Sequence, residues 1–424
     1  TWKSFSRKHG FGKGGISAMA VDGDVIWIAT VYDTTTDVEG VVQAGGGLAY
    51  TLNGGRQWKY VPQPTDNTNI WNTTWGIAIV DSTVWIGSFA GGLQKSTSWK
   101  DPRWVSEYYE IDWQLVEPDE YNFDPVEYAN HRVFSVEYID DVLWVGTAQG
   151  LNRSLDGGKT WANFNHQNQE KPISGNWILA IANQKYDDKN IIWAATWETT
   201  SESEDTTEFR GVSKSEDGGY TWETSLKGES VYNFAFDDSV VYACALSGLF
   251  KSIDGGKTWA KYPNIVDFGA DERVYSEEVY SAAITDGPTL WVGSGDGLAK
   301  TTDDGYNWKI YRAFSPTGQN GEKRTYTYPN PFSPLRDNQL GGDGYVRIQY
   351  NTKNATRVTI RIFDFAMDLV ATPVKDKQRP AGGDFSEVWN GKTDDGKRLA
   401  NGVYFYQLKL DGDGTYWGKV MILD

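Results

Sequence analysis

Four copies of one short pattern constrain most strongly what this chain can fold into. Each copy is eight residues long, with Ser or Thr first, Asp third, Gly fifth and Trp eighth. The copies occupy residues 154–161, 215–222, 252–259 and 301–308, and a degenerate copy with Asn in place of Asp occupies residues 51–58. A pattern that recurs at intervals of tens of residues indicates a fold built from repeated units.

Each copy has the composition of a tight turn between two strands. The Asp side chain can accept hydrogen bonds from the backbone N–H groups that follow it, and glycine readily adopts the positive φ angles that such turns need. The Trp then begins a new strand. The pattern therefore predicts a hairpin turn followed by a strand at each of these places.

The pattern resembles the Asp-box of sialidases and related β-propellers, Ser-x-Asp-x-Gly-x-x-Trp. In those proteins the box occupies the turn between the third and fourth strands of a blade and is structural. The resemblance implies a structural role, without chemistry, for the Asp and the Trp of each copy. These residues are Asp156 and Trp161, Asp217 and Trp222, Asp254 and Trp259, and Asp303 and Trp308.

A second repeat precedes each turn and consists of an apolar strand, a tight turn and another apolar strand centred on Trp or Tyr. The second strands lie at residues 25–29, 84–87, 142–146, 191–195, 240–244 and 290–293. Their β-branched and aromatic residues indicate strands, and their nearly continuous apolar character indicates burial on both faces. Six such units between residues 14 and 314 predict an all-β chain with a β-propeller of six or seven four-stranded blades. Residues 1–5 resemble a fourth strand, so they either complete a partial seventh blade or show that the sequence begins inside a longer protein.

The composition excludes several classes of function. The chain has 424 residues and a net charge of −17, which argues against binding to nucleic acid and disfavours docking on anionic lipid. No apolar run approaches the ~20 residues of a transmembrane helix. The single Cys244 cannot form an intrachain disulfide, and only three His, at positions 9, 131 and 166, are scattered along the sequence. A zinc site or catalytic triad based on His is therefore not expected.

The C-terminal quarter of the chain has a different pattern. Residues 315–327 are turn-like and predict a linker between a propeller at residues 1–314 and a small domain at residues 328–424. Strands with period-2 alternation in the last segment predict an antiparallel, immunoglobulin-like β-sandwich.

This last segment resembles the immunoglobulin-like domain of flagellar hook-capping proteins and the C-terminal sorting domain of type IX secretion cargo. The resemblance rests on Pro-Asn-Pro-Phe at residues 329–332, Trp-Asn-Gly at 389–391, Asn-Gly-Val-Tyr-Phe-Tyr at 401–406 and the terminal Lys-Val-Met-Ile at 419–422. It departs at Phe365 and Ala366, where members of these groups usually carry a Gly. The resemblance implies contact with export machinery or attachment at the cell surface. A plain accessory sandwich remains the alternative.

The long connections predict where binding occurs. Residues 32–45, 108–131, 198–210 and 263–278 are all assigned to one face, because they are taken to join second to third strands or successive blades. Long loops on a rigid scaffold usually carry function. Their acidic and aromatic side chains suit a sugar, a cation or a basic protein, and a merely solvated acidic surface is equally open. The predicted ligand-binding residues are Tyr108, Tyr109, Asp112, Trp113, Glu117, Tyr121, Asp124, Glu202, Asp205 and Asp271.

The sequence therefore favours a secreted or cell-surface protein, on the exterior of a bacterial outer membrane, that binds a protein or glycan without catalysis. A glycoside hydrolase acting on polysaccharide is one alternative, although many carboxylates are present and none can be paired from sequence. A structural subunit of an export or surface assembly is another. No cofactor is expected, apart from weak candidates for calcium ligands. These are Asp411, Asp413 and Thr415, and Asp33, Asp37 and Glu39.

Overall fold

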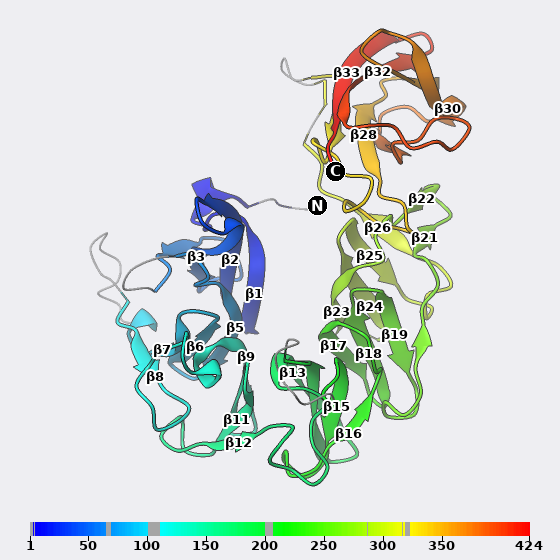
Figure 1. Ribbon diagram of the computed structural model, residues 1–424. Helices are drawn as coiled ribbons and strands as arrows, with labels where there is room; N and C mark the ends of the chain where they lie inside the picture. Colours follow the sequence, from blue (N-terminus) through cyan, green and yellow to red (C-terminus); the bar gives the residue numbers. More distant parts are fainter. Residues whose placement is uncertain are drawn as a thin grey trace. The chain divides into compact units, whose positions relative to one another are not determined.

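Strands are the main regular structure of the described residues. The computed structural model describes residues 3, 5–64, 69–100, 111–199, 207–285, 287–315, 317–318 and 323–424. The chain divides into two compact units, Thr1–Lys261 and Tyr262–Asp424 (Figure 1).

The first unit contains five antiparallel sheets of four strands, each in simple sequential order. Each sheet has the predicted four strands, and the fourth strand is the shortest in every case. The five sheets are β1(Gly15–Asp22), β2(Val25–Thr36), β3(Gly40–Thr51) and β4(Lys59–Val61); β5(Thr74–Val80), β6(Thr83–Ser88), β7(Gly92–Ser96) and β8(Gln114–Val116); β9(Val133–Ile139), β10(Val142–Thr147), β11(Gly150–Ser154) and β12(Ala162–Phe164); β13(Trp177–Tyr186), β14(Lys189–Trp197), β15(Gly211–Ser215) and β16(Glu223–Ser225); and β17(Val231–Asp237), β18(Val240–Ala245), β19(Gly248–Ser252) and β20(Ala260–Lys261). Among the described residues, the short 3-10 helices η1(Arg7–His9), η2(Ser98–Lys100) and η4(Ala129–His131) lie in the connections.

The second unit begins with a sixth sheet of the same kind and ends with the sandwich. The sixth sheet consists of β23(Val279–Thr285), β24(Thr289–Ser294), β25(Gly297–Thr301) and β26(Lys309–Tyr311), and the small hairpin β21(Val266–Asp267)–β22(Glu272–Arg273) precedes it. These six sheets are the blades of a β-propeller. A seventh four-stranded sheet in the described residues belongs to the sandwich.

The sandwich contains a three-stranded and a four-stranded sheet. The first has the order β27(Thr325–Tyr328), β28(Val346–Asn351), β31(Asp384–Trp389), and the second has the order β30(Leu369–Arg379), β29(Thr356–Phe363), β32(Gly402–Leu410), β33(Gly414–Ile422). Alternate residues of both sheets face a common core that contains Ile348, Ile360 and Phe332, each 0 % exposed. The fold class expected from the sequence, a propeller followed by an immunoglobulin-like sandwich, is confirmed.

The predicted turn chemistry is present between the third and fourth strands. Asp156 Oδ1 accepts hydrogen bonds from the backbone N–H groups of Lys159 and Thr160 at 3.0 and 2.9 Å, and Ser154 Oγ accepts one from Gly158 N–H at 2.8 Å. Thr160 Oγ1 also donates to Asp156 Oδ2 at 2.7 Å, and this bond, with the backbone N–H groups, holds the pKa of Asp156 well below its ordinary value. The same side-chain-to-backbone bonds recur at Asp217, Asp254 and Asp303.

In the first unit, the turn of one blade also packs against the buried aromatic side chain of the preceding blade. The Trp or Tyr at the centre of each second strand is buried, with exposed fractions of 0 % for Trp27, 4 % for Trp85, 3 % for Trp144, 0 % for Trp193 and 5 % for Tyr242. A Cβ on the turn residue Gly256 would lie only 2.5 Å from the ring of Trp193 in the preceding blade, and Gly256 also has a φ of +84°. Glycine is therefore needed there both for its backbone angle and for the close approach of two blades.

One expected loop is part of a sheet. Residues 32–45, predicted as a long connection, are mostly an extension of β2 and β3, which pair from Ile26–Thr51 out to Thr36–Gly40. The Thr residues at positions 34–36 have high strand propensity, which favours continued pairing over a loop.

Candidate binding sites

A chain of side-chain amides runs through the third blade. Asn165 Nδ2 donates to Asn163 Oδ1 at 2.8 Å, and Asn163 Nδ2 donates to Asn152 Oδ1 at 3.0 Å. Asn152 Nδ2 donates to Asn130 Oδ1 at 2.8 Å, and Asn130 Nδ2 donates to Asp119 Oδ2 at 3.0 Å. Each amide therefore fixes the orientation of the next, and the chain ends on a carboxylate.

That carboxylate also binds a buried histidine. Asp124 N–H donates to His131 Nδ1 at 2.9 Å, so Nε2 carries the proton and donates to Asp119 Oδ1 at 3.0 Å. Burial would raise the pKa of Asp119, but the hydrogen bonds from Asn130, Tyr121 N–H and His131 outweigh it and hold the pKa below its ordinary value. Both ring nitrogens of His131 are occupied, so the ring has no free site for proton transfer.

Both ring nitrogens of the half-buried His166 are also occupied by hydrogen bonds. His166 Nδ1 lies 2.6 Å from the carbonyl oxygen of Ile173 and must donate to it, so Nε2 accepts from Thr207 Oγ1 at 2.8 Å. Neither histidine resembles the exposed base of a nucleophilic or general-base site.

Two predicted ligand residues stabilise the loop that contains them. Asp124 Oδ1 accepts hydrogen bonds from the backbone N–H groups of Val126 and Glu127, which lower the pKa of Asp124. Tyr121 is 49 % exposed and stacks on Tyr128, with ring centroids 4.5 Å apart. The stacked pair offers an aromatic surface on a rigid loop. Glu117 is half-buried just before this loop.

Two other predicted ligand residues, Asp112 and Trp113, belong to a turn in the second blade that has the hydrogen bonds of the repeated turns but a different sequence. Ser98 N–H donates to Ser96 Oγ at 3.2 Å, and Asp112 N–H donates to Ser98 Oγ at 3.0 Å. The same bonds join residues 154, 156 and 160 in the third blade, so Ser98 takes the place of the turn Asp, and Trp113 directly precedes β8 as the turn Trp precedes β12. Trp113 packs edge-on against Trp27 at 6.3 Å. The assignment of residues 111–113 to the same face as the other long connections is therefore wrong, because they belong to the connection between β7 and β8.

A carboxylate that sequence reasoning did not select lies at the end of the connection at 198–210. Glu208 is 9 % exposed and accepts hydrogen bonds from the side chains of Asn176 and Gln167, both at 2.8 Å, and from Thr199 N–H at 2.9 Å. Through these hydrogen bonds Glu208 links the connection between β12 and β13 to the connection between β14 and β15. The predicted residues Tyr108, Tyr109, Glu202 and Asp205 lie outside the described residues.

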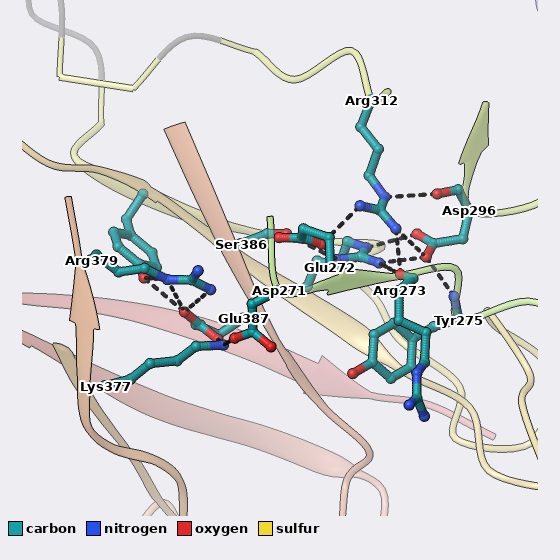
Figure 2. Close-up of polar contacts among 12 residues, drawn as sticks. Asp271, Glu272, Arg273, Tyr275, Asp296, Arg312, Lys377, Arg379, Ser386 and Glu387 are labelled. Atoms are coloured by element: carbon teal, nitrogen blue, oxygen red, sulfur yellow. Dashed lines mark hydrogen bonds and ion pairs between the residues drawn. The ribbon is translucent and has the colours of Figure 1, made fainter. Parts of the chain in front are cut away.

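Asp271, the last predicted ligand residue, belongs to an ionic network in the second unit (Figure 2). Its carboxylate lies 2.8 Å from Lys377 Nζ, which also lies 3.1 Å from Glu387 Oε2. The other oxygen of Glu387 accepts from Arg379 Nε at 2.9 Å and from Tyr350 Oη at 2.8 Å. The β21–β22 hairpin is thereby bonded to strands β30 and β31 of the sandwich.

The other half of the network is centred on Asp296, at the turn between β24 and β25. Its carboxylate accepts from Arg347 Nε at 2.7 Å and from Arg312 at 3.0 Å, and the backbone N–H of Tyr275 donates to it at 2.8 Å. Burial would raise the pKa of Asp296, but the two guanidinium groups outweigh burial and hold it below its ordinary value. Arg347 also donates to Ser386 Oγ at 2.9 Å. The side chains of Arg347 and Asp296 are only 3 % and 5 % exposed.

A cavity of about 260 Å³ lies among the residues of this network. Arg347, Arg379 and Lys377 are each within ion-pair distance of a carboxylate, whereas the exposed Arg273 forms no ion pair within the described residues. The network therefore joins elements of the fold, and its buried charges neutralise one another.

A larger cavity of about 370 Å³ lies in the first blade. The segment before β1, the extended part of β2 and β3, and the start of β4 all contribute to it, through Arg7, Lys13, Tyr32 and Tyr60 among others. Sequence reasoning missed this site because it followed acidic loops, whereas the charged groups of the cavity are basic. The Gly45-Gly46-Gly47 run within a strand was the available signal, since glycine inside a strand marks close backbone approach.

The calcium candidates do not form a ligand cluster in the structure. Glu39 accepts a hydrogen bond from Trp71 Nε1 at 2.8 Å, Asp411 pairs with Lys409 at 3.0 Å, and Asp413 pairs with Arg324. Within the described residues, no group of three His, Cys, Asp or Glu side chains is placed to hold a metal ion. In the same residues, no helix has the length and apolarity that crossing a membrane requires.

Comparison with known families identifies part of the C-terminal domain. The family model of the FlgD Ig-like domain matches residues 336–414, so the sandwich contains a domain of this kind. No curated protein matches the chain.

Several solved structures resemble the chain at low identity. PorZ of Porphyromonas gingivalis, described as a surface component of the type-IX secretion system, is 16 % identical with a TM-score of 0.40, and the match covers 98 % of this chain and 60 % of PorZ. YCF48 from Cyanidioschyzon merolae is 12 % identical with a TM-score of 0.46, over 80 % of this chain and 92 % of that one. An ancestral GH74 enzyme is 14 % identical with a TM-score of 0.48, over 96 % and 62 % of the two chains. The chain thus spans less than two thirds of PorZ, and the fold assignment rests on the strand pairing described above.

Proposed function

We propose that this protein is a non-catalytic binding and scaffold protein of the bacterial cell surface. Its propeller binds a protein or glycan partner, and its C-terminal domain serves export or attachment. We assign residues 1–314 to the propeller, 315–327 to a linker and 328–424 to the C-terminal domain.

The observation that carries this proposal is the ionic network of Figure 2. Asp296, Glu272 and Asp271 precede the linker, whereas Arg347, Lys377 and Glu387 follow it, and these groups are bonded to one another. Removing one partner of a buried ion pair leaves an uncompensated charge, which is strongly unfavourable. A C-terminal domain held in this way acts as a built-in part of the sixth blade, as a scaffold requires.

The state of the polar groups supports binding over hydrolysis. A glycosidase of the usual kind needs two carboxyl groups facing one substrate at a defined separation. Asp119 and Glu208 are engaged by three or more donors each, and Glu387 and Asp296 are neutralised by basic groups. Rigid, satisfied polar groups of this kind position a surface and do not transfer protons.

A combined binding and hydrolysis assay tests the proposal. The purified chain is incubated with a panel of polysaccharides and glycans, and both retention and released reducing ends are measured, followed by a pull-down from the cell envelope. We expect retention of at least one glycan or envelope protein and no reducing ends. Release of sugar would establish the hydrolase alternative, and absence of any partner in both assays would refute a binding role.

The contribution of the C-terminal domain is tested by its attachment. We expect the sixth blade and the sandwich to lose protection from hydrogen exchange together during mild denaturation. Independent loss of protection in the sandwich would contradict the scaffold assignment and favour a detachable tail.

A further inference from the structure

The cavity of the first blade has an unusual charge for this protein. Acidic residues exceed basic ones by 57 to 40 over the whole chain, yet the charged groups in this cavity are Arg7 and Lys13. Neither side chain forms an ion pair with a carboxylate within the described part of the chain. Two basic groups without counter-charges, facing one cavity, attract an anionic group of a ligand.

The walls of the cavity add apolar contact. Lys13 Nζ lies 3.6 Å from the ring centroid of Tyr32, so the ammonium is held in place over the aromatic face. Tyr60, which is 51 % exposed, and Phe11 provide further ring surface. Phe11 is itself fixed by stacking with Phe5 and by contact with Trp58, with centroids 5.6 and 4.8 Å apart.

An open strand edge leads away from this cavity. β1 pairs with β2 only as far as Val31, whereas β2 continues to Thr36 and pairs with β3 along its whole length. Residues 32–36 therefore have a neighbour on one side only, within the residues that the structure describes. An unpaired edge of this kind can accept an extended peptide as an additional strand.

The charges along this edge define the polarity of such a peptide. The cavity carries Arg7 and Lys13, whereas the exposed Asp33 lies along the edge and Asp37 and Glu39 follow its far end. A peptide with negative charge along its length would be repelled by these carboxylates. A peptide that ends in a single carboxylate places that group at the basic end and its neutral or basic body along the edge.

We propose that this cavity and the adjoining edge of β2 bind the C-terminal carboxylate of an extended peptide. Arg7 and Lys13 bind the carboxylate, the tyrosines contact the last side chain, and residues 32–36 pair with the peptide backbone. This inference rests on the proposed binding role and specifies its partner as a protein with an exposed C-terminus.

The test uses one peptide in matched chemical forms. An N-terminally fluorescein-labelled Gly-Thr-Val-Lys-Val-Thr peptide is titrated with the full chain, and fluorescence anisotropy is measured for the free acid, the C-terminal amide and an acid form N-methylated at alternate residues. We expect the free acid to bind at least tenfold more tightly than the amide. The N-methylated form should also bind several-fold more weakly, because it cannot complete strand pairing.

Matched variants locate the binding. Arg7→Gln and Lys13→Gln should each weaken binding of the free acid several-fold, whereas Lys8→Gln, an exposed neighbour outside the cavity, should change it less than twofold. Circular dichroism and thermal unfolding confirm that each variant is folded. Equal affinity for acid and amide, or an equal effect of Lys8→Gln, would overturn the proposal.

A second ligand separates this inference from the wider proposal. If oligogalacturonate binds and Lys13→Gln weakens it while the peptide does not bind, the cavity is a site for acidic saccharides and the peptide inference is wrong. If the peptide fails while the envelope pull-down still captures a partner, the site is wrong and the binding role stands. Failure of peptide, saccharide and pull-down together would refute both.

Discussion

Both compact units contain a cavity lined by basic side chains, and the two cavities differ in what those side chains face. In the second unit, Arg347 and Arg379 are 3 % and 5 % exposed, and both form ion pairs with buried carboxylates. In the first unit, Arg7 and Lys13 are exposed and have no carboxylate partner within the described residues.

This difference separates structural charges from available charges. Ionic groups that are removed from water must be neutralised by the fold itself, because an unpaired buried charge is too costly to retain. Exposed groups around a cavity carry no such requirement and remain available to a ligand. Position in the fold, more than the type of residue, therefore predicts what each basic group does.

The largest test of this comparison removes a buried counter-charge. We expect Asp296→Ala to lower the free energy of unfolding of the second unit by about 3–5 kcal/mol, because Arg347 and Arg312 would lose their shared carboxylate. Urea unfolding followed by fluorescence measures the change. Since the pKa of Asp296 is lowered in the folded state, the stabilisation that it provides is present at neutral pH and is lost as the pH falls into the acidic range.

An exposed ion pair of the same unit provides the control. Asp411 pairs with Lys409 at 3.0 Å, with both side chains about half exposed, so Asp411→Ala should change stability by less than about 1 kcal/mol. Equal effects of the two substitutions would show that burial does not distinguish these charges.

The fold could be predicted further than the binding sites, for physical reasons visible in single residues. Turns at Asp156 and Asp254 were predicted because their hydrogen bonds join residues within four positions of each other. The turn of the second blade was missed because Ser98 replaces Asp and its partner Asp112 lies 14 positions away.

The candidate sites depend on contacts between distant segments, which no local pattern encodes. Asp271 was predicted as a ligand residue, but its partner Lys377 lies far along the chain in the sandwich. The Asn chain was missed because an Asn in a strand has no distinctive local signal. Its meaning appears only when Asn152 and Asn163 become cross-strand partners.

A second test examines the neutral counterpart of the ionic network. Asn130 is 6 % exposed, donates to Asp119, and accepts from Thr147 Oγ1 and Asn152 Nδ2 at 2.9 and 2.8 Å. We expect Asn130→Ala to destabilise the first unit by about 2–3 kcal/mol, because the buried Asn152 Nδ2 would lose its acceptor and Asp119 and Thr147 would each lose a hydrogen bond. The exposed amide Gln57→Ala serves as the control in the same urea measurement. A change below that of Gln57→Ala would show that water replaces the amide without cost.

A third test concerns a carboxylate that faces no cation. Glu137 on β9 has no side-chain hydrogen bond or ion pair within the described part of the chain, and burial raises its pKa to about 7. The unfolded chain deprotonates this group near its ordinary value of 4.5, so stability should fall as the pH rises from there to about 7. Glu137→Gln should therefore stabilise the protein by about 1–3 kcal/mol at pH ~8 and leave it unchanged at pH ~4. Thermal unfolding at both pH values measures this, with exposed Glu170→Gln as the control, and equal effects at the two pH values would contradict it.

The smallest expected effect tests the comparison most directly. Arg7→Gln should change the free energy of unfolding by less than about 0.5 kcal/mol, and Lys13→Gln by no more than about 1 kcal/mol, the contribution of its contact with Tyr32. Groups that remain exposed and unpaired add little to stability, so their removal should hardly change the free energy of unfolding measured in urea. If Lys13→Gln instead destabilised the first unit as much as Asp296→Ala destabilises the second, both sets of basic groups would be structural. An unchanged free energy of unfolding together with a loss of ligand affinity would identify these two side chains as groups retained for binding.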